Sequence, residues 1–80
     1  MPTVFIIFGI RFFFYKHDHE PIHIHVEYQG ASAKIQVEPE IKVVWNRGLK
    51  SQMLKKAVET VLAYKDDIIA EWGKNFSKND

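Results

Sequence analysis

The sequence predicts an α+β fold in which an antiparallel sheet of about four to five short strands is followed by one C-terminal amphipathic helix. Three observations support this prediction. The first half of the chain contains short runs of β-branched and aromatic residues, separated by turns that contain glycine or proline. Within several runs apolar and polar residues alternate, as they do on a sheet with one buried face. From Leu49 onward the apolar period changes from two to about 3.6 residues.

Two strands are predicted near the N-terminus, at residues 3–8 and 10–15. Gly9 between them marks a bend, a bulge or a very tight turn. In the first strand Phe5 and Ile7 share one face, and the other apolar side chains share the opposite face. Apolar residues on both faces predict a central strand that is covered on both sides.

A polar segment at residues 17–21 predicts a loop that leads into a third strand at residues 22–28. The third and fourth strands, the latter at residues 31–37, should form an antiparallel hairpin around a turn at Gln29–Gly30. A short last strand is expected at residues 41–45.

A single helix is predicted from Leu49 onward, with Ser51 capping its start and Gly73 its end. The domain should therefore span residues 1–73, and residues 74–80 should form a frayed tail. The helix carries one apolar stripe, which consists of Leu54, Ala57, Val58, Val61, Leu62, Ile68, Ile69 and Trp72.

Composition narrows the classes of function. The 80 residues include no cysteine, so a metal ion would have to be held by histidine and carboxylate side chains. The net charge of +1 does not favour strong non-specific binding to nucleic acid. The apolar stretch at residues 4–14 is too short for a membrane span and lacks the basic leader of a signal peptide, so we expect no membrane association and a cytoplasmic location.

A sheet with one helix leaves most of one face without cover from its own chain. That face is predicted to carry Phe5, Ile7, Phe13 and Tyr15. Exposed apolar patches mark interaction surfaces, so we expect either a homodimer or another protein partner to bind there.

All four histidines of the chain fall between His17 and His25. His23 and His25 are two residues apart on the third predicted strand, so they share a face and their Cα atoms should lie about 6.6 Å apart. His19 from the loop could complete a three-histidine site, or Glu27 or Asp18 could complete a two-histidine site, and either would suit zinc, iron, nickel or copper.

The histidines allow other interpretations. They could form a hydrogen-bonded polar ladder that only packs, or His19, His23 and His25 could share acid/base catalysis without a metal. Protonated imidazole could also recognise an anion or a partner in a pH-dependent way. The sequence leaves these alternatives open.

Several residues together form a pattern: Met1-Pro2-Thr3, Gly9-Ile10, Tyr15 before Asp18-His19, Pro21-x-His23-x-His25-Val26 and Trp72. This pattern resembles the small bacterial proteins grouped as domain of unknown function 4160, whose hallmark is an Asp-His-x-Pro-Pro-His-x-His-Val segment. The resemblance covers nearly the whole chain, and Ile22 replaces the second proline of the hallmark.

The resemblance implies a bacterial or phage origin and a compact stand-alone protein with no established activity. Such proteins are often encoded beside another small protein, which suggests toxin–antitoxin pairs. Our leading hypothesis is accordingly a binding or interaction protein with a polar or metal-binding histidine patch. The alternatives are a hydrolase, with or without a metal, that acts on a phosphodiester such as RNA, and a nucleic-acid-binding regulator.

Overall fold

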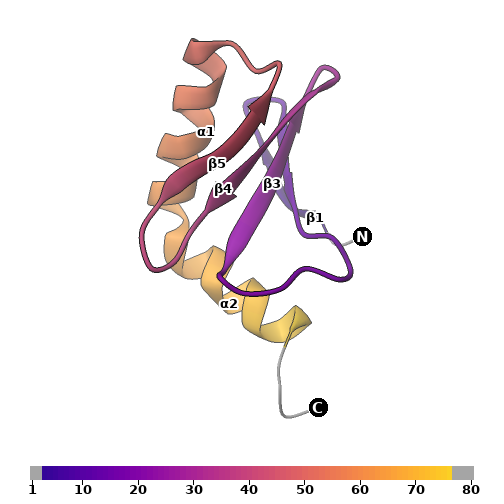
Figure 1. Ribbon diagram of the computed structural model, residues 1–80, viewed down its shortest axis with the longest axis vertical. Helices are drawn as coiled ribbons and strands as arrows, with labels where there is room; N and C mark the ends of the chain where they lie inside the picture. The colour runs from indigo at the N-terminus through magenta and orange to yellow at the C-terminus, as the bar shows by residue number, and fades with distance from the viewer. Residues whose placement is uncertain (1–2, 77–80) are drawn as a thin grey trace.

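The computed structural model describes residues 3–76, in which five strands form one sheet and two helices pack on one of its faces (Figure 1). The elements are β1 (Thr3–Ile7), β2 (Ile10–Phe13), β3 (His23–Tyr28), β4 (Ala31–Gln36), β5 (Lys42–Arg47), α1 (Ser51–Ala63) and α2 (Lys65–Asn75). The strands lie in the order β1-β2-β3-β4-β5, and every neighbouring pair is antiparallel. The predicted α+β class with an antiparallel sheet is confirmed.

Two of the connections are two-residue hairpin turns. Phe8 and Gly9 join β1 to β2 with φ angles of 57° and 75°, and Gln29 and Gly30 join β3 to β4 with φ angles of 46° and 84°. Positive φ at both central residues is the geometry that matches the twist of paired strands, and glycine adopts it without strain. The hairpin predicted around Gln29–Gly30 is therefore confirmed.

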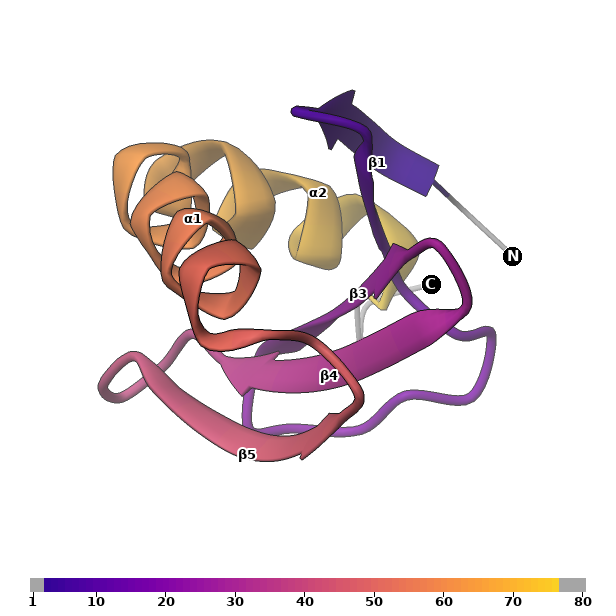
Figure 2. The same ribbon diagram turned by 90° about the horizontal axis from the view of Figure 1, so that it is seen from above.

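The core lies between the sheet and the helices, and Figure 2 shows the sheet curling around α1 and α2. Alternate apolar residues of β2, β3 and β4 face the helices because successive strand side chains point to opposite faces. The buried apolar residues of this core are Ile10, Phe12, Phe14, Ile24, Val26, Ala33, Ile35, Val37, Leu49, Ala57, Val61, Ile68 and Trp72.

The expectation of a single C-terminal helix is wrong, because the helical region is divided at Tyr64. This residue leaves helical geometry, with φ −109° and ψ 22°, and its ring lies 5.2 Å from that of Phe5. Asp66 and Asp67 then occupy the first turn of α2, where the positive end of the helix dipole favours carboxylates. Leu62, expected in the apolar stripe, is 65% exposed just before this break.

Both predicted helix caps also differ from the structure. Ser51 is the first residue of α1 rather than its cap, and the capping position is Lys50, whose side chain makes no capping hydrogen bond. Gly73 lies inside α2, which continues to Asn75 because the ring of Phe76 packs 4.4 Å from that of Trp72.

α2 thus extends past Gly73 into the range predicted as a tail, and residues 77–80 lie outside the described part of the chain. Neither helix within residues 3–76 has the length and apolar character needed to cross a membrane.

β1 is an edge strand rather than the central strand expected from its two apolar faces. Phe5 pairs with Phe12 and Ile7 with Ile10, so both side chains point toward the helices and pack on the core. A register irregularity precedes Phe5. The placement of Phe5 and Ile7 on an uncovered face is therefore wrong, and Ile6 is the strand residue that is exposed there.

Phe13 and Tyr15, the other two residues predicted for the partner surface, differ from each other in exposure. Phe13 does lie on the face opposite the helices, but it is only 3% exposed, because Tyr15 packs edge-on against its ring and the Arg11 guanidinium stacks 4.4 Å from its centre. Of the four residues predicted to form a partner surface, Tyr15 alone is exposed. Partner binding itself stays a prediction.

Candidate metal centre

His23 and His25 lie side by side on β3, on the sheet face opposite the helices. Their ring centres are 5.0 Å apart and the rings are perpendicular. The alternation of β3 places them there, because Ile24 between them faces the core. They are nevertheless only 4% and 7% exposed, because the segment between β2 and β3 folds back over this part of the sheet and the Trp72 ring of α2 lies 5.2 Å from that of His23.

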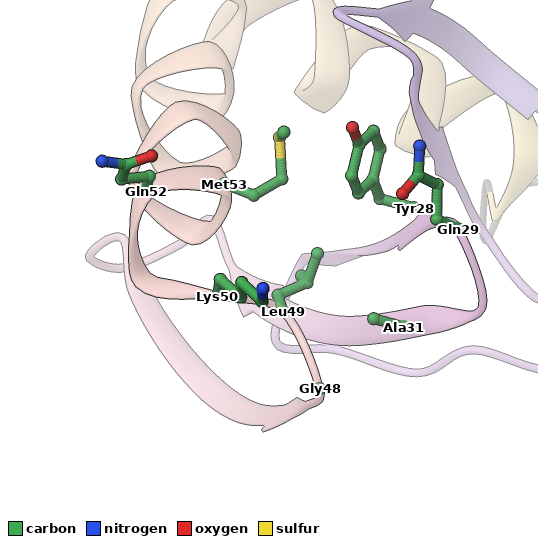
Figure 3. A pocket seen from close by; sticks show the side chains of 8 residues that line it. All are labelled: Tyr28, Gln29, Ala31, Gly48, Leu49, Lys50, Gln52 and Met53. Atoms are coloured by element: carbon green, nitrogen blue, oxygen red, sulfur yellow. The ribbon is translucent and has the colours of Figure 1, made fainter.

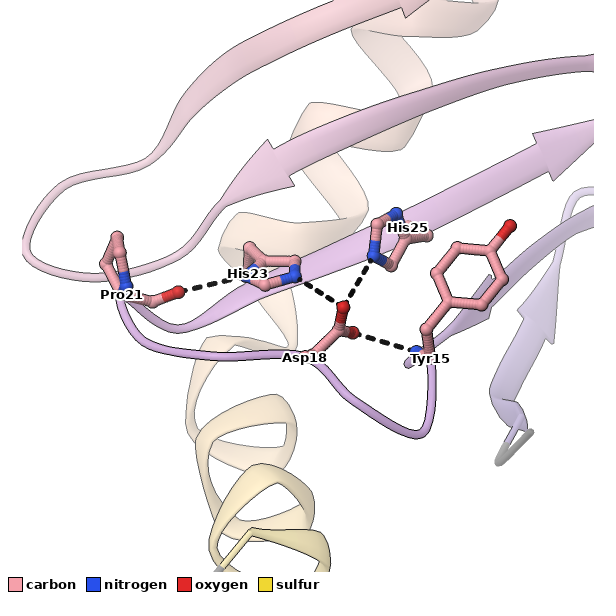
Figure 4. Close-up of polar contacts among 5 residues, drawn as sticks. All are labelled: Tyr15, Asp18, Pro21, His23 and His25. Carbon is pink, nitrogen blue, oxygen red and sulfur yellow. Dashed lines mark hydrogen bonds and ion pairs between the residues drawn. The ribbon is translucent and has the colours of Figure 1, made fainter.

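Asp18 is the residue of that segment that faces the two rings (Figure 4). A turn holds it in place: the Asp18 amide donates to the Tyr15 carbonyl, at 3.2 Å, and Asp18 Oδ2 accepts from the Tyr15 amide, at 2.8 Å. The other carboxylate oxygen, Oδ1, is left to point at the histidines. It lies 3.1 Å from His23 Nε2 and 3.2 Å from His25 Nε2.

The protonation of His23 is restricted by its second ring nitrogen. Nδ1 lies 2.9 Å from the Pro21 carbonyl oxygen, which can only accept, so Nδ1 must carry a proton. A neutral ring then has an unprotonated Nε2 whose lone pair faces Asp18 Oδ1. Nε2 is buried, and in a ring of this form it has no proton to donate to Asp18 Oδ1. Two electron-rich atoms at 3.1 Å require a proton or a cation between them.

His25 is enclosed by aromatic rings. It stacks on Phe13, with ring centres 5.6 Å apart, and Tyr15 meets it edge-on at 4.5 Å. Burial lowers the pKa of His25, and this effect outweighs the hydrogen bond and negative charge of Asp18. His25 is therefore held neutral, and its Nδ1 is buried without a partner within residues 3–76.

For the Asp18 carboxylate, the contacts that stabilise its charge outweigh the effect of burial on its pKa. Burial alone would raise the pKa of Asp18, but the hydrogen bond from the Tyr15 amide and the contacts with the two histidine rings hold that pKa below its usual value. Asp18 is thus an anion at neutral pH, and it offers a negatively charged oxygen to the two imidazole nitrogens.

Only part of the predicted ligand set comes together. Asp18, His23 and His25 each contribute one ligand atom to a group whose atoms all lie within 4.8 Å of one another. His19 is exposed in the loop and does not belong to this group. Glu27 points along the same strand face but pairs with Arg11 at 2.8 Å, so it is not a ligand.

Two pockets of similar size lie at opposite ends of the sheet. One, of about 400 Å³, adjoins Asp18 and His23. The other, of about 390 Å³, lies between the β3–β4 turn and the start of α1, where Tyr28 and Met53 face each other (Figure 3). The second pocket has Lys50 as its one charged lining residue and has no histidine or carboxylate. Of these two pockets, only the first is lined by side chains that could bind a metal ion.

The family model described as Domain of unknown function (DUF4160) matches residues 9–73 of the 80-residue chain. The chain belongs to this family. The match confirms the resemblance, and it spans every residue of the Asp18–His23–His25 group. No curated protein and no solved structure matches the chain.

In this DUF4160 protein the residues of the hallmark segment have different structural roles, which the sequence did not reveal. Asp18, His23 and His25 supply facing side-chain atoms, whereas Pro21 contributes its backbone carbonyl as the partner of His23. No feature of the sequence identifies that carbonyl in advance, since backbone groups carry no side-chain signature.

Proposed function

We propose that this DUF4160 protein is a metal-binding domain in which Asp18, His23 and His25 hold one divalent transition-metal ion. The observation that carries the proposal is the position of His23 Nε2, which lies 3.1 Å from Asp18 Oδ1 while Nδ1 faces a carbonyl oxygen at 2.9 Å. An ion bound by both atoms would replace this contact with two ligand bonds.

The geometry is compatible with that ion. Ligand bonds of about 2.0 to 2.2 Å in a tetrahedral site place ligand atoms about 3.3 to 3.6 Å apart. The two separations from Asp18 Oδ1 are slightly shorter, at 3.1 and 3.2 Å, and all the ligand atoms lie within 4.8 Å of one another. The Pro21 carbonyl also supports the proposal, because a metal-binding imidazole usually donates its other N–H to a carbonyl or carboxylate, which fixes the ring.

The ligand types indicate which ions to test. Two imidazole nitrogens and one carboxylate oxygen suit zinc, and the same set with open positions suits iron(II). Nickel and copper also accept imidazole. Three protein ligands leave at least one coordination position for another molecule, which is typical of reactive rather than purely structural sites.

The competing explanation is a salt bridge, in which His23 carries two protons and Asp18 binds the imidazolium. Metal titration separates the two. Untagged, chelator-treated protein should bind one equivalent of zinc or iron(II) per chain, measured by calorimetry and elemental mass spectrometry. The His23→Ala/His25→Ala double variant should lose this binding, and His17→Ala, which removes an exposed histidine of the same segment, should keep it. A folded wild-type protein that binds none of the four metals would refute the proposal.

The pocket beside Asp18 and His23 favours hydrolysis of a phosphodiester such as RNA as a second candidate function. A divalent ion with an open position supplies an acidified water molecule or polarises a phosphoryl oxygen. Labelled single-stranded RNA should then be cleaved by metal-loaded protein and spared after chelation; RNA that stays intact with equimolar loaded protein would exclude this activity. A role in a two-protein module stays a prediction from the family.

A further inference from the structure

The pocket beside the proposed metal centre is lined by one positively charged side chain, Lys34, which is not among the proposed metal ligands. Lys34 lines this pocket together with Asp18 and His23. It lies on β4 directly opposite His25, and its charge is close enough to disfavour protonation of that ring. Lys34 is partly buried and takes part in none of the ion pairs formed within residues 3–76. An ammonium group in this position can bind an anionic ligand.

The balance of charge in the pocket depends on the metal. Two carboxylates, Asp18 and Glu20, line it against the one ammonium of Lys34, so its formal charge without an ion is negative. The histidines that line it, His17, His19 and His23, add no charge when neutral. A divalent ion would reverse the sign and would place a strong positive charge beside Lys34.

We propose that this pocket binds an oxyanion of the phosphate class, held between the metal ion and the Lys34 ammonium, and that the anion binds only after the metal. This inference rests on the proposed metal site. A tetrahedral phosphate presents several oxygens in different directions, so one can approach the ion while another accepts from Lys34. A volume of about 400 Å³ leaves room for the organic group of a phosphate ester.

The test uses the full chain loaded with cobalt(II), whose visible spectrum reports changes in its ligands. Inorganic phosphate is titrated into the loaded and the metal-free protein, and calorimetry gives the affinity. Phosphate should change the cobalt spectrum and bind the loaded protein at least about tenfold more tightly than acetate. The metal-free protein should show no phosphate binding. Single-stranded RNA serves as a second probe, and its binding would identify the source of the phosphate as a phosphodiester.

Variants of Lys34 test whether its ammonium group binds the phosphate. Lys34→Met should keep stoichiometric cobalt but lose phosphate affinity by about tenfold or more, the effect of removing a hydrogen bond to a charged group. Lys34→Arg should retain most of that affinity, and Lys55→Met, which removes an exposed lysine of α1, should retain all of it.

The two proposals can fail separately. Absence of cobalt binding would overturn the metal site and this inference with it. Cobalt binding with no response to phosphate or RNA would overturn this inference alone, as would equal binding of acetate, equal binding by the metal-free protein, or unchanged phosphate affinity in Lys34→Met.

Discussion

Replacing Asp18 by asparagine distinguishes a metal ligand from a salt-bridge partner, because the two side chains have nearly the same shape. The asparagine carbonyl can still accept the Tyr15 amide that Asp18 Oδ2 accepts at 2.8 Å. The amide NH₂ then takes the place of Oδ1 and can donate to the unprotonated Nε2 of His23. The loop should therefore keep its conformation, while the charged ligand atom is lost.

The expected magnitude follows from ligand linkage. With metal at 100 times the wild-type dissociation constant, binding stabilises the wild-type fold by about 2.7 kcal/mol. Loss of even a supporting residue weakens metal sites by about 10 to 100-fold, so loss of a ligand should weaken this one at least 100-fold. The variant would then gain about 0.4 kcal/mol under the same conditions. A difference of about 2.3 kcal/mol in a chain of this size corresponds to about 9 to 18 °C in melting temperature.

The assay is thermal unfolding followed by circular dichroism, with and without the metal, for wild-type protein and Asp18→Asn. Asp67→Asn is the matched control, because it makes the same substitution at an exposed residue of α2. The control should show the full metal-dependent rise in melting temperature, even if loss of a favourable helix-dipole interaction lowers its stability by about 0.3 to 1 kcal/mol.

Two results would contradict this reasoning. A metal-dependent rise that is unchanged in Asp18→Asn would show that the carboxylate is not a ligand. A metal-free variant that is less stable than metal-free wild type by more than about 2 kcal/mol would instead indicate a charged hydrogen bond from a doubly protonated His23.

Two further predictions concern stability. Metal-free protein should become less stable as the pH falls below about 6.5, because burial lowers the pKa of His25 from that ordinary value and the unfolded chain takes up the proton first. A second loss of stability should follow below pH 3.8, the ordinary pKa of Asp18, since the folded-state pKa of Asp18 is lower still. Urea unfolding from pH 7.5 to 3 measures both losses. Stability that stays level or rises as the pH falls to 5 would contradict the prediction for His25. Phe14→Ala should lower the free energy of unfolding by about 3 to 5 kcal/mol, because Phe14 is fully buried against Trp72. Leu62→Ala, at an exposed position, should change it by less than about 0.5 kcal/mol. Equal effects in urea unfolding would mean that the core is misplaced.

The sequence was sufficient where a local rule determines the structure. Alternation along β3 placed His23 and His25 on one face because strand side chains have a period of two. Gln29–Gly30 predicted a hairpin because few residue pairs adopt positive φ angles together. The match to the family followed from the same hallmark residues.

Two predictions, the single helix and the face of Phe5, were wrong because local sequence patterns do not determine these features. The apolar period of the helical region continues across Tyr64, so periodicity alone could not locate the break. The carboxylates at positions 66 and 67 are a local signal for a new helix start, and they could have been read as such. Phe5 was assigned to the wrong face because both faces of its strand are apolar, and only pairing with Phe12 selects the face that the helices cover.

The candidate metal centre shows the same difference between what the sequence and the structure determine. The sequence determined that His23 and His25 share a face, but it could not choose among Asp18, His19 and Glu27 as their companion. Asp18 and His19 are neighbours in a loop, where no fixed period sets the direction of a side chain. The choice was made by the turn that returns Asp18 to the Tyr15 amide and by the Arg11 that engages Glu27. The Arg11–Glu27 pair joins two strands, and the turn at Asp18 depends on the backbone path of an irregular segment, so neither contact follows from strand periodicity.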